Sequence, residues 1–325
     1  MSQSPQSIHT CALPPNHAWR SLVDRSLAAW DTIISQHPET SNNLATESIQ
    51  TCDSLESFLK EYIVPFSGFP MFWFFQLQSS YLAQSRLSKW SPDNLDDYVL
   101  LPALPGFVWR SNCFFVSHFW HSPQHPDPDG TYLSLYQNDL RQQTWEYIWV
   151  DWTCMPQEPR EVHEKAYFTR CLRTVSGIIR NCGFMYYYPP FEARLWILYE
   201  LAEYLFTCDG KLPPTPDLQT FLDHVYEMCD KGVRPTLEKY EYRSSSAKDW
   251  EILVPWLELL VLMKQLPFDV SFIRKVMDHI TWFNVTGPQL YSGIMEVDRY
   301  QGILRFQGEE WRFTPFPQWR KAGLE

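Results

Sequence analysis

Hydrophobic and polar positions between residues 107 and 206 form short apolar runs that alternate with helix-like segments. Apolar runs cover residues 107–109, 113–116, 147–150 and 182–188, and residues 158–180 and 194–206 repeat their apolar positions at helical spacing. Short apolar runs between helices are typical of a parallel β-sheet covered on both faces. We therefore predict an α/β core over residues 107–210.

Unusual polar residues follow the apolar runs directly. Ser117 and His118 come directly after the run at 113–116, and Asp151 comes directly after the run at 147–150. In open α/β sheets, ligands bind beyond the carboxyl ends of the strands. The pattern therefore predicts a functional site at that edge of the sheet.

The flanking regions have different patterns. Residues 1–16 are polar and read as a flexible arm, and residues 17–106 as a helical N-terminal region in which the aromatic run 69–82 is a buried helix or a clamp against the sheet. A Pro-rich linker at 211–216 opens the last region, residues 211–325. There we expect helices at 217–231, 250–265 and 270–280, and then a small antiparallel meander over 294–313.

Composition and net charge argue against some classes of protein. The chain has 325 residues, of which 45% are apolar, and a net charge of −11, which argues against a general nucleic-acid or anionic-membrane surface. Its 8 Cys show no CxxC spacing, as expected for reduced thiols in a cytosolic protein. Residues 1–16 lack an export signal, and no apolar run reaches about 18 residues, so we expect a cytoplasmic protein without a membrane span.

Glu200 is the first candidate for chemistry. On a helix, Trp196, Glu200 and Tyr204 form one stripe, with Glu203 close by and Arg194 at the helix start. A carboxylate between two rings is partly desolvated, which raises its pKa and suits acid–base work or stabilisation of a cation. The alternative interpretation is a solvated helix face.

The loop after the first strand is the second candidate. Ser117 could act as a nucleophile, or the loop could bind a ligand through His118, Trp120 and His121. The histidines could also ligate a metal, but His-rich loops more often form hydrogen bonds, and we expect no metal. Asp151 is either a functional carboxylate at its strand end or the cap of the next turn, and Trp152 beside it would line the same pocket.

These segments resemble the TIR-like superfamily, which includes the fungal heterokaryon-incompatibility (HET) domains. The residues that carry the resemblance are Phe-Phe-Val-Ser-His-Phe-Trp (114–120), Trp-Val-Asp-Trp-Thr-Cys-Met-Pro-Gln (149–157) and Arg-Leu-Trp-Ile-Leu-Tyr-Glu-Leu (194–201). The resemblance covers about residues 107–206 and implies a flavodoxin-like fold. In enzymatically active TIR domains the glutamate that matches Glu200 cleaves the nicotinamide–ribose bond of NAD. The resemblance thus implies NAD as substrate, with Trp120 or Trp196 stacking on the base and Asp151 lining the pocket.

Three hypotheses about function follow. The first is an enzyme that cleaves or transfers at an N-glycosidic bond of a nucleotide, with Glu200 stabilising the developing cation and no tightly bound cofactor. The second is a biosynthetic transferase, since the chain is similar in size to the fungal arginine-containing cyclodipeptide synthases, which use aminoacyl-tRNAs. A basic patch of Lys165, Arg170, Arg173 and Arg180 would favour this hypothesis. The third is a non-catalytic incompatibility or signalling module that acts by self-association into a homo-oligomer.

Overall fold

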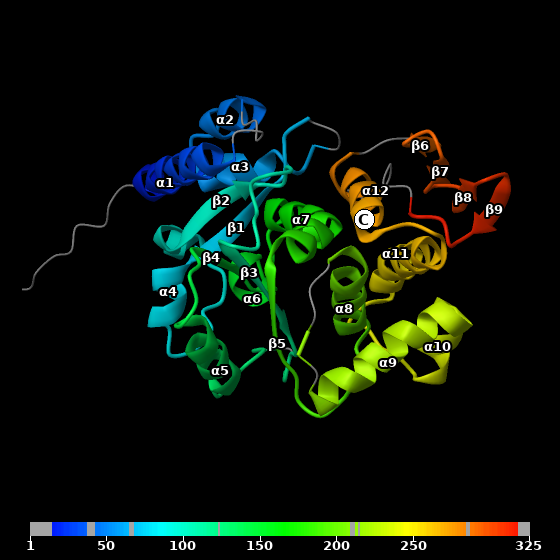
Figure 1. Ribbon diagram of the computed structural model, residues 1–325. Coiled ribbons are helices and arrows are strands. Elements are labelled where there is room, and N and C mark those ends of the chain that lie inside the picture. Colours follow the sequence, from blue (N-terminus) through cyan, green and yellow to red (C-terminus); the bar gives the residue numbers. More distant parts are fainter. Residues whose placement is uncertain are drawn as a thin grey trace, which may run out of the picture.

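The computed structural model describes residues 15–37, 43–64, 68–122, 124–208, 212–213, 215–283 and 287–317. The protein is a mixed α/β fold with a central sheet and a second, smaller sheet near the C-terminus (Figure 1). This confirms the predicted α/β class and its antiparallel C-terminal sheet. The expected arm lies almost entirely outside the described residues, as do residues 211 and 214 of the linker at 211–216.

The central sheet has five strands in the order β2-β1-β4-β3-β5. The pairs β3–β4 and β3–β5 are parallel, whereas β1 runs antiparallel to both β2 and β4. The sheet is therefore mixed, not parallel throughout. Its strands are β1 (Phe72–Leu77), β2 (Tyr98–Pro102), β3 (Cys113–His118), β4 (Tyr147–Trp149) and β5 (Gly183–Tyr187).

The aromatic run at 69–82 was predicted as a helix or clamp, and this was wrong. Residues 72–77 form β1, an inner strand of the sheet between β2 and β4, and the short helix α4 (Gln78–Ala83) follows it. Phe72, Trp73, Phe74 and Phe75 are all fully buried. A strand covered on both faces is a continuous apolar run, and its periodicity does not distinguish it from a buried helix.

The helices cover the two faces of the central sheet (Figure 1). Helices α4 and α5 (Thr131–Leu140) pack on the face formed by Phe114, Val116 and Ile148. The opposite face carries Phe115 and Trp149 and packs against α1 (Pro15–Gln36), α3 (Leu55–Lys60) and α7 (Val162–Asn181). The two short elements near these faces are α2 (Asn43–Gln50) and the 3-10 helix η1 (Pro92–Asp97).

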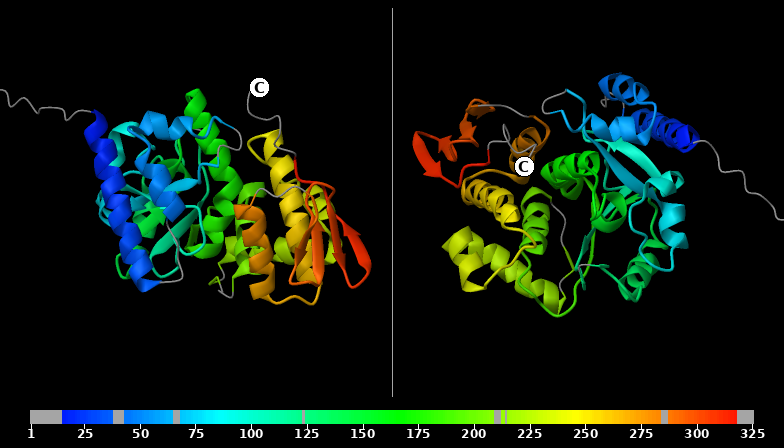
Figure 2. Two further views of the ribbon diagram at one scale, coloured as in Figure 1. Left: turned by 90° about the horizontal axis from the view of Figure 1, so that it is seen from above. Right: turned by 180° about the vertical axis from the view of Figure 1, so that it is seen from behind.

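The last region builds a second layer outside α8 (Leu195–Thr207). Helix α8 packs against α7 on one side and against α9 (Pro216–Lys231), α11 (Ala247–Gln265) and α12 (Val270–Trp282) on the others. Helix α10 is Val233–Lys239, and the small sheet has β6 (Gln289–Tyr291), β7 (Met295–Asp298), β8 (Ile303–Phe306) and β9 (Glu309–Arg312). Figure 2 shows this sheet and the N-terminal helices at opposite ends of the molecule. The predicted helices 217–231, 250–265 and 270–280 and the predicted meander are confirmed.

None of the described helices is long and apolar enough to cross a membrane.

Candidate functional site

A crevice is expected where the connections from two neighbouring parallel strands leave to opposite faces of a sheet. After β3 the chain passes to α5 on one face, and after β4 it passes through α6 (Asp151–Cys154) to α7 on the other face. The carboxyl ends of β3 and β4 therefore form such a switch point. It lies at the edge of the sheet that the sequence predicted.

Ser117 links this edge of the sheet to α8. Its hydroxyl Oγ donates a hydrogen bond to Oε2 of Glu200 and lies 2.6 Å from the phenolic oxygen of Tyr188, the first residue after β5. Ser117 itself is fully buried. A side chain from each of β3, the β5 end and α8 therefore meets at one point.

Glu200 is partly exposed, and its carboxyl group sits among these buried partners. Burial raises the pKa of Glu200 to about 8; the hydrogen bond from Ser117 lowers it, and the charge of Asp151 raises it. The carboxyl of Glu200 is therefore mostly protonated at neutral pH. Because Asp151 acts on Glu200 through its charge, the two carboxyl groups share one electrostatic environment.

Asp151 is the first residue of α6 and is also partly exposed. Its Oδ2 accepts the indole N–H of Trp120 at 2.8 Å, and its Oδ1 accepts the backbone N–H of Trp152 at 2.6 Å. Burial raises the pKa of Asp151 to about 6, and the hydrogen bonds from Trp120 and Trp152 lower it. Asp151 is thus mostly ionised at neutral pH, where Glu200 is mostly protonated. Carboxyl groups whose environments hold their pKa values apart are suited to different roles in acid–base chemistry.

Ser117 and His118 point to opposite faces of the sheet, because successive side chains alternate along a strand. The ring of His118 lies on the α5 face, where Nδ1 is 3.5 Å from the phenolic oxygen of Tyr136. Burial lowers the pKa of His118 to about 4, so its imidazole is neutral at physiological pH. His118 therefore does not serve Ser117 as a base.

The rings of Trp120 and His121 lie on the α5 side of the sheet. The exposed His121 packs against Tyr132, with ring centroids 4.9 Å apart. Trp120 meets Trp152 edge to face at 5.3 Å. Among the described residues, no group of three or more His, Cys, Asp or Glu side chains could hold a metal ion.

The predicted stripe on α8 does not converge on Glu200. Trp196 packs against Tyr199 and hydrogen-bonds with Asp249. Tyr204 lies against Phe184, with a centroid distance of 4.8 Å. Side chains four positions apart are about 40° apart around a helix, so a stripe over two turns meets different neighbours.

The remaining two predicted residues have separate surroundings. Arg194 precedes α8, pairs with Glu192 at 3.0 Å and places its guanidinium 4.9 Å from the ring of Phe119. It therefore lies beside the loop that follows β3. Glu203 is fully buried and pairs with Arg180 and Trp256, away from the group around Ser117.

Tyr188 belongs to the site, although the sequence analysis did not select it. The rule that identified Ser117 and Asp151 could have found it, because Tyr188 also follows a parallel strand directly. The phenol of Tyr188 contacts Ser117. Burial is the main cause of its raised pKa, and the nearby carboxyl of Glu200 raises it further. Tyr188 is thus a neutral hydrogen-bonding group at the site.

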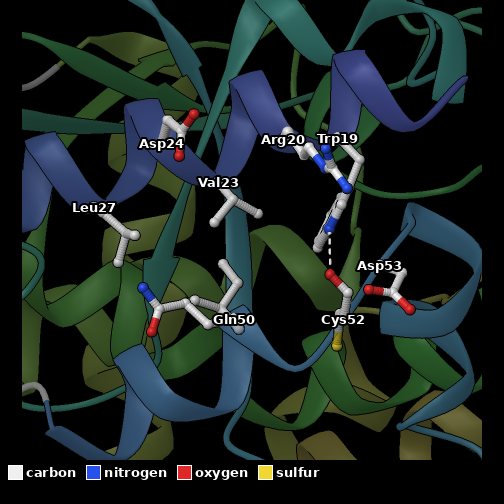
Figure 3. Close-up of a pocket in the computed structure, with 9 residues that line it drawn as sticks. Trp19, Arg20, Val23, Asp24, Leu27, Gln50, Cys52 and Asp53 are labelled. Carbon is white, nitrogen blue, oxygen red and sulfur yellow. Dashed lines mark hydrogen bonds between the residues drawn. The ribbon is translucent and has the colours of Figure 1, made fainter. Parts of the chain in front are cut away.

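A groove of about 250 Å³ lies elsewhere, between α1 and α2 (Figure 3). Val23 and Leu27 of α1 face Gln50 across it, and Trp19 closes one end by donating its indole N–H to the carbonyl of Cys52 at 2.8 Å. None of the residues that line the groove belongs to the group around Ser117. The groove is therefore separate from the candidate site around Glu200 and Asp151.

Comparison with known proteins gives no relative: no family model matches the chain, and no match was found among the curated proteins or the solved structures.

Proposed function

We propose that this protein is an enzyme that cleaves or transfers at an N-glycosidic bond of an NAD-like nucleotide. The observation that carries the proposal is the hydrogen bond between Ser117 and Glu200, next to Asp151, at the carboxyl ends of parallel strands. It joins a buried hydroxyl to the carboxyl of Glu200, and the charge of Asp151, whose pKa is lower, acts on that carboxyl at the edge where open α/β sheets bind ligands.

The reaction needs negative charge beside the ribose. As the bond between C1′ and the base nitrogen breaks, its electron pair stays on the nitrogen, the pyridinium ring becomes neutral and positive charge develops on the ribose. Asp151 supplies a carboxylate at neutral pH, and a cation near Glu200 would lower the pKa of its carboxyl and favour its ionised form. Water then adds to C1′ and loses a proton to a carboxylate.

Ser117 has a positioning role in this proposal. Its hydroxyl is fully buried and donates to Glu200, so it fixes one oxygen of that carboxyl group and leaves the other for the substrate. This arrangement favours Ser117 as a support of Glu200 over Ser117 as a nucleophile. Tyr188 holds the same hydroxyl from the side of β5.

The test compares the native protein with Glu200→Gln, which keeps the shape of the side chain and removes its ionisation. Purified protein is incubated with NAD, and nicotinamide and ADP-ribose are measured by mass spectrometry. We expect release by the native protein and a loss of about a hundredfold or more in the variant, the range for a group that acts in the transition state. Glu238→Gln, an exposed carboxylate on α10, is the matched control and should keep full activity.

The biosynthetic transferase remains the second candidate, because two carboxyl groups at one site also suit an amine or guanidinium. The proposed basic patch does not support it: Arg180 is fully buried, and Arg170 donates to the carbonyl of Phe69 at 2.7 Å. Mass spectrometry of extracts from a host that expresses the native protein would distinguish these candidates. A new Arg-containing diketopiperazine, absent with Glu200→Gln, would replace the NAD proposal by the transferase, and no difference between folded proteins would favour the self-associating module.

A further inference from the structure

Glu203 stands one turn after Glu200 on α8 and has a different set of partners. Its side chain is fully buried, and one oxygen pairs with the guanidinium of Arg180 on α7. The other oxygen accepts the indole N–H of Trp256 on α11 at 2.5 Å. Residues three apart on a helix lie about 60° from each other around the axis, so Glu200 and Glu203 occupy neighbouring faces of α8.

Arg180 extends this contact to α12. Its Nε lies 2.9 Å from Oδ1 of Asp278, and its Nη2 donates to Oγ1 of Thr281 at 2.6 Å and to the carbonyl of Met277 at 3.2 Å. The network of Arg180, Glu203, Trp256, Asp278 and Thr281, in which Arg180 and Glu203 are fully buried, therefore joins α7, α8, α11 and α12. Two of these helices belong to the core and two to the C-terminal region.

The network contacts one face of α8, and Glu200 contacts Ser117 from the neighbouring face of the same helix. Among the described residues, no side chain caps the first turn of α8, and its start is held by backbone hydrogen bonds between Leu195, Ala193 and Arg243. Further along the helix, the ion pair of Glu203 with Arg180 is a fully buried contact that also restricts its rotation. A turn of the helix that broke the bonds of Glu203 would also move Glu200 away from Ser117.

We propose that Glu203 is a positioning residue: its bonds to Arg180 and Trp256 orient α8 so that Glu200 reaches Ser117. The C-terminal helices α11 and α12 thus complete the candidate site and are not an independent appendage. The inference rests on the role proposed for Glu200, but it can be measured without any activity.

The test follows the proton of Glu200 directly. A protonated carboxyl group has its own carbonyl band in pH-difference infrared spectra, and the band that disappears in Glu200→Gln belongs to Glu200. The variants are Glu203→Gln, which replaces the ion pair by a neutral hydrogen bond, and Trp256→Phe, which removes the donor of the second bond together with part of the ring. Trp250→Phe, the same change on the same helix but away from Glu203, is the control.

We expect Glu203→Gln and Trp256→Phe to let water reach Glu200, since burial is the main cause of its raised pKa. Its titration should then move toward ordinary values by about one pH unit or more, a tenfold change in proton affinity, while Trp250→Phe leaves it in place. A lowered Tm with an unchanged Glu200 titration would reduce Glu203 to a structural ion pair and overturn the inference. If Glu203→Gln does not fold, Trp256→Phe decides alone.

Failure of the proposed function gives a different result. A native protein whose spectra lack a Glu200 band near neutral pH would contradict the pKa on which the role of Glu200 depends, and the inference would fall with it. A native band at the expected pH without NAD cleavage would instead leave the positioning of Glu200 intact and remove only the reaction.

Discussion

Trp120 donates its indole N–H to the carboxylate of Asp151 across the carboxyl ends of two parallel strands, at 2.8 Å. The bond connects the chain just after β3 to the chain just after β4, with the donor from one and the acceptor from the other. It also stabilises the charged form of Asp151, whose pKa burial raises to about 6. The charge available at the candidate site near neutral pH therefore depends in part on this indole N–H, together with the backbone N–H of Trp152.

Trp120→Phe should consequently raise the pKa of Asp151 further. A hydrogen bond to a charged group contributes about 1.5–3 kcal/mol, so an upward shift of about one pH unit is expected. The acidic limb of the pH profile of kcat/KM for NAD cleavage should move to higher pH, with activity returning above about pH 8.

Trp152→Phe is the matched control for this change. It also removes an indole N–H, but the Nε1 atom of Trp152 has no hydrogen-bond partner among the described residues. An equal shift of the acidic limb in both variants would mean that ring volume, not the bond to Asp151, determines the profile.

Glu200→Gln should make the stability of the protein less dependent on pH. The folded pKa of about 8 exceeds the ordinary value of 4.5, so the folded protein retains a proton that the unfolded chain has lost. This contribution to the native free energy of unfolding is fully present below about pH 4.5 and disappears as the pH rises through about 8.

Urea unfolding of both proteins between about pH 5 and pH 9 checks this sign. As the pH rises across this range, the free energy of unfolding of the Gln variant should increase by roughly 1–3 kcal/mol relative to that of the native protein. This figure is smaller than the full pKa shift would give, because Glu200 keeps contact with solvent. Parallel curves for the two proteins would show that Glu200 titrates with an ordinary pKa.

The placement of Ser117 and Asp151 at one edge of the sheet could be predicted from the sequence, because it follows from strand direction. Ser117 and Asp151 each stand just after an apolar run, and parallel strands bring such positions to one edge. The bond between Ser117 and Glu200 could not be predicted, since it depends on where α8 packs. The same rule could have selected Tyr188. It stands at the end of a run of aromatic residues, however, and such a run is also expected of a strand that packs in the core.

Errors arose where a pattern of apolar residues has two structural solutions. The apolar run around Phe74 is compatible with a buried helix and with an inner strand. Only its pairing with β2 and β4 shows that it is a strand. A surface patch that included Arg180 would have favoured the transferase hypothesis, but Arg180 is buried, and a sequence does not reveal that Glu203 and Asp278 come from helices packed around it. Both points concern long-range contacts that local periodicity does not contain.

Gly183→Ala should destabilise the sheet beneath the site. Gly183 pairs with Phe114 across β5 and β3, and a Cβ atom at position 183 would overlap the Phe114 ring. That ring is buried and packs edge to face on Trp145, at a centroid distance of 6.1 Å, so it has little room to move. Such overpacking costs about 1–3 kcal/mol, measurable by urea unfolding.

The double variant Gly183→Ala with Phe114→Leu identifies the cause. A smaller side chain at position 114 leaves room for the added methyl group, so the double variant should lose less stability than the sum of the single changes. Strict additivity would assign the loss to the backbone of β5 instead of the Phe114 ring.

Arg180→Met should be among the most damaging single changes in the chain. It leaves the carboxylate of Glu203 fully buried without its ionic partner, and removing one member of a buried pair costs about 3–5 kcal/mol. The double variant Arg180→Met with Glu203→Gln should recover much of that loss, because no uncompensated charge remains. Arg312→Met, which removes an exposed partner of Glu310, should cost less than about 1 kcal/mol. Urea unfolding of the four proteins would measure these differences, and a double variant no more stable than Arg180→Met would show that the network acts through the shape of Arg180 and not through its charge.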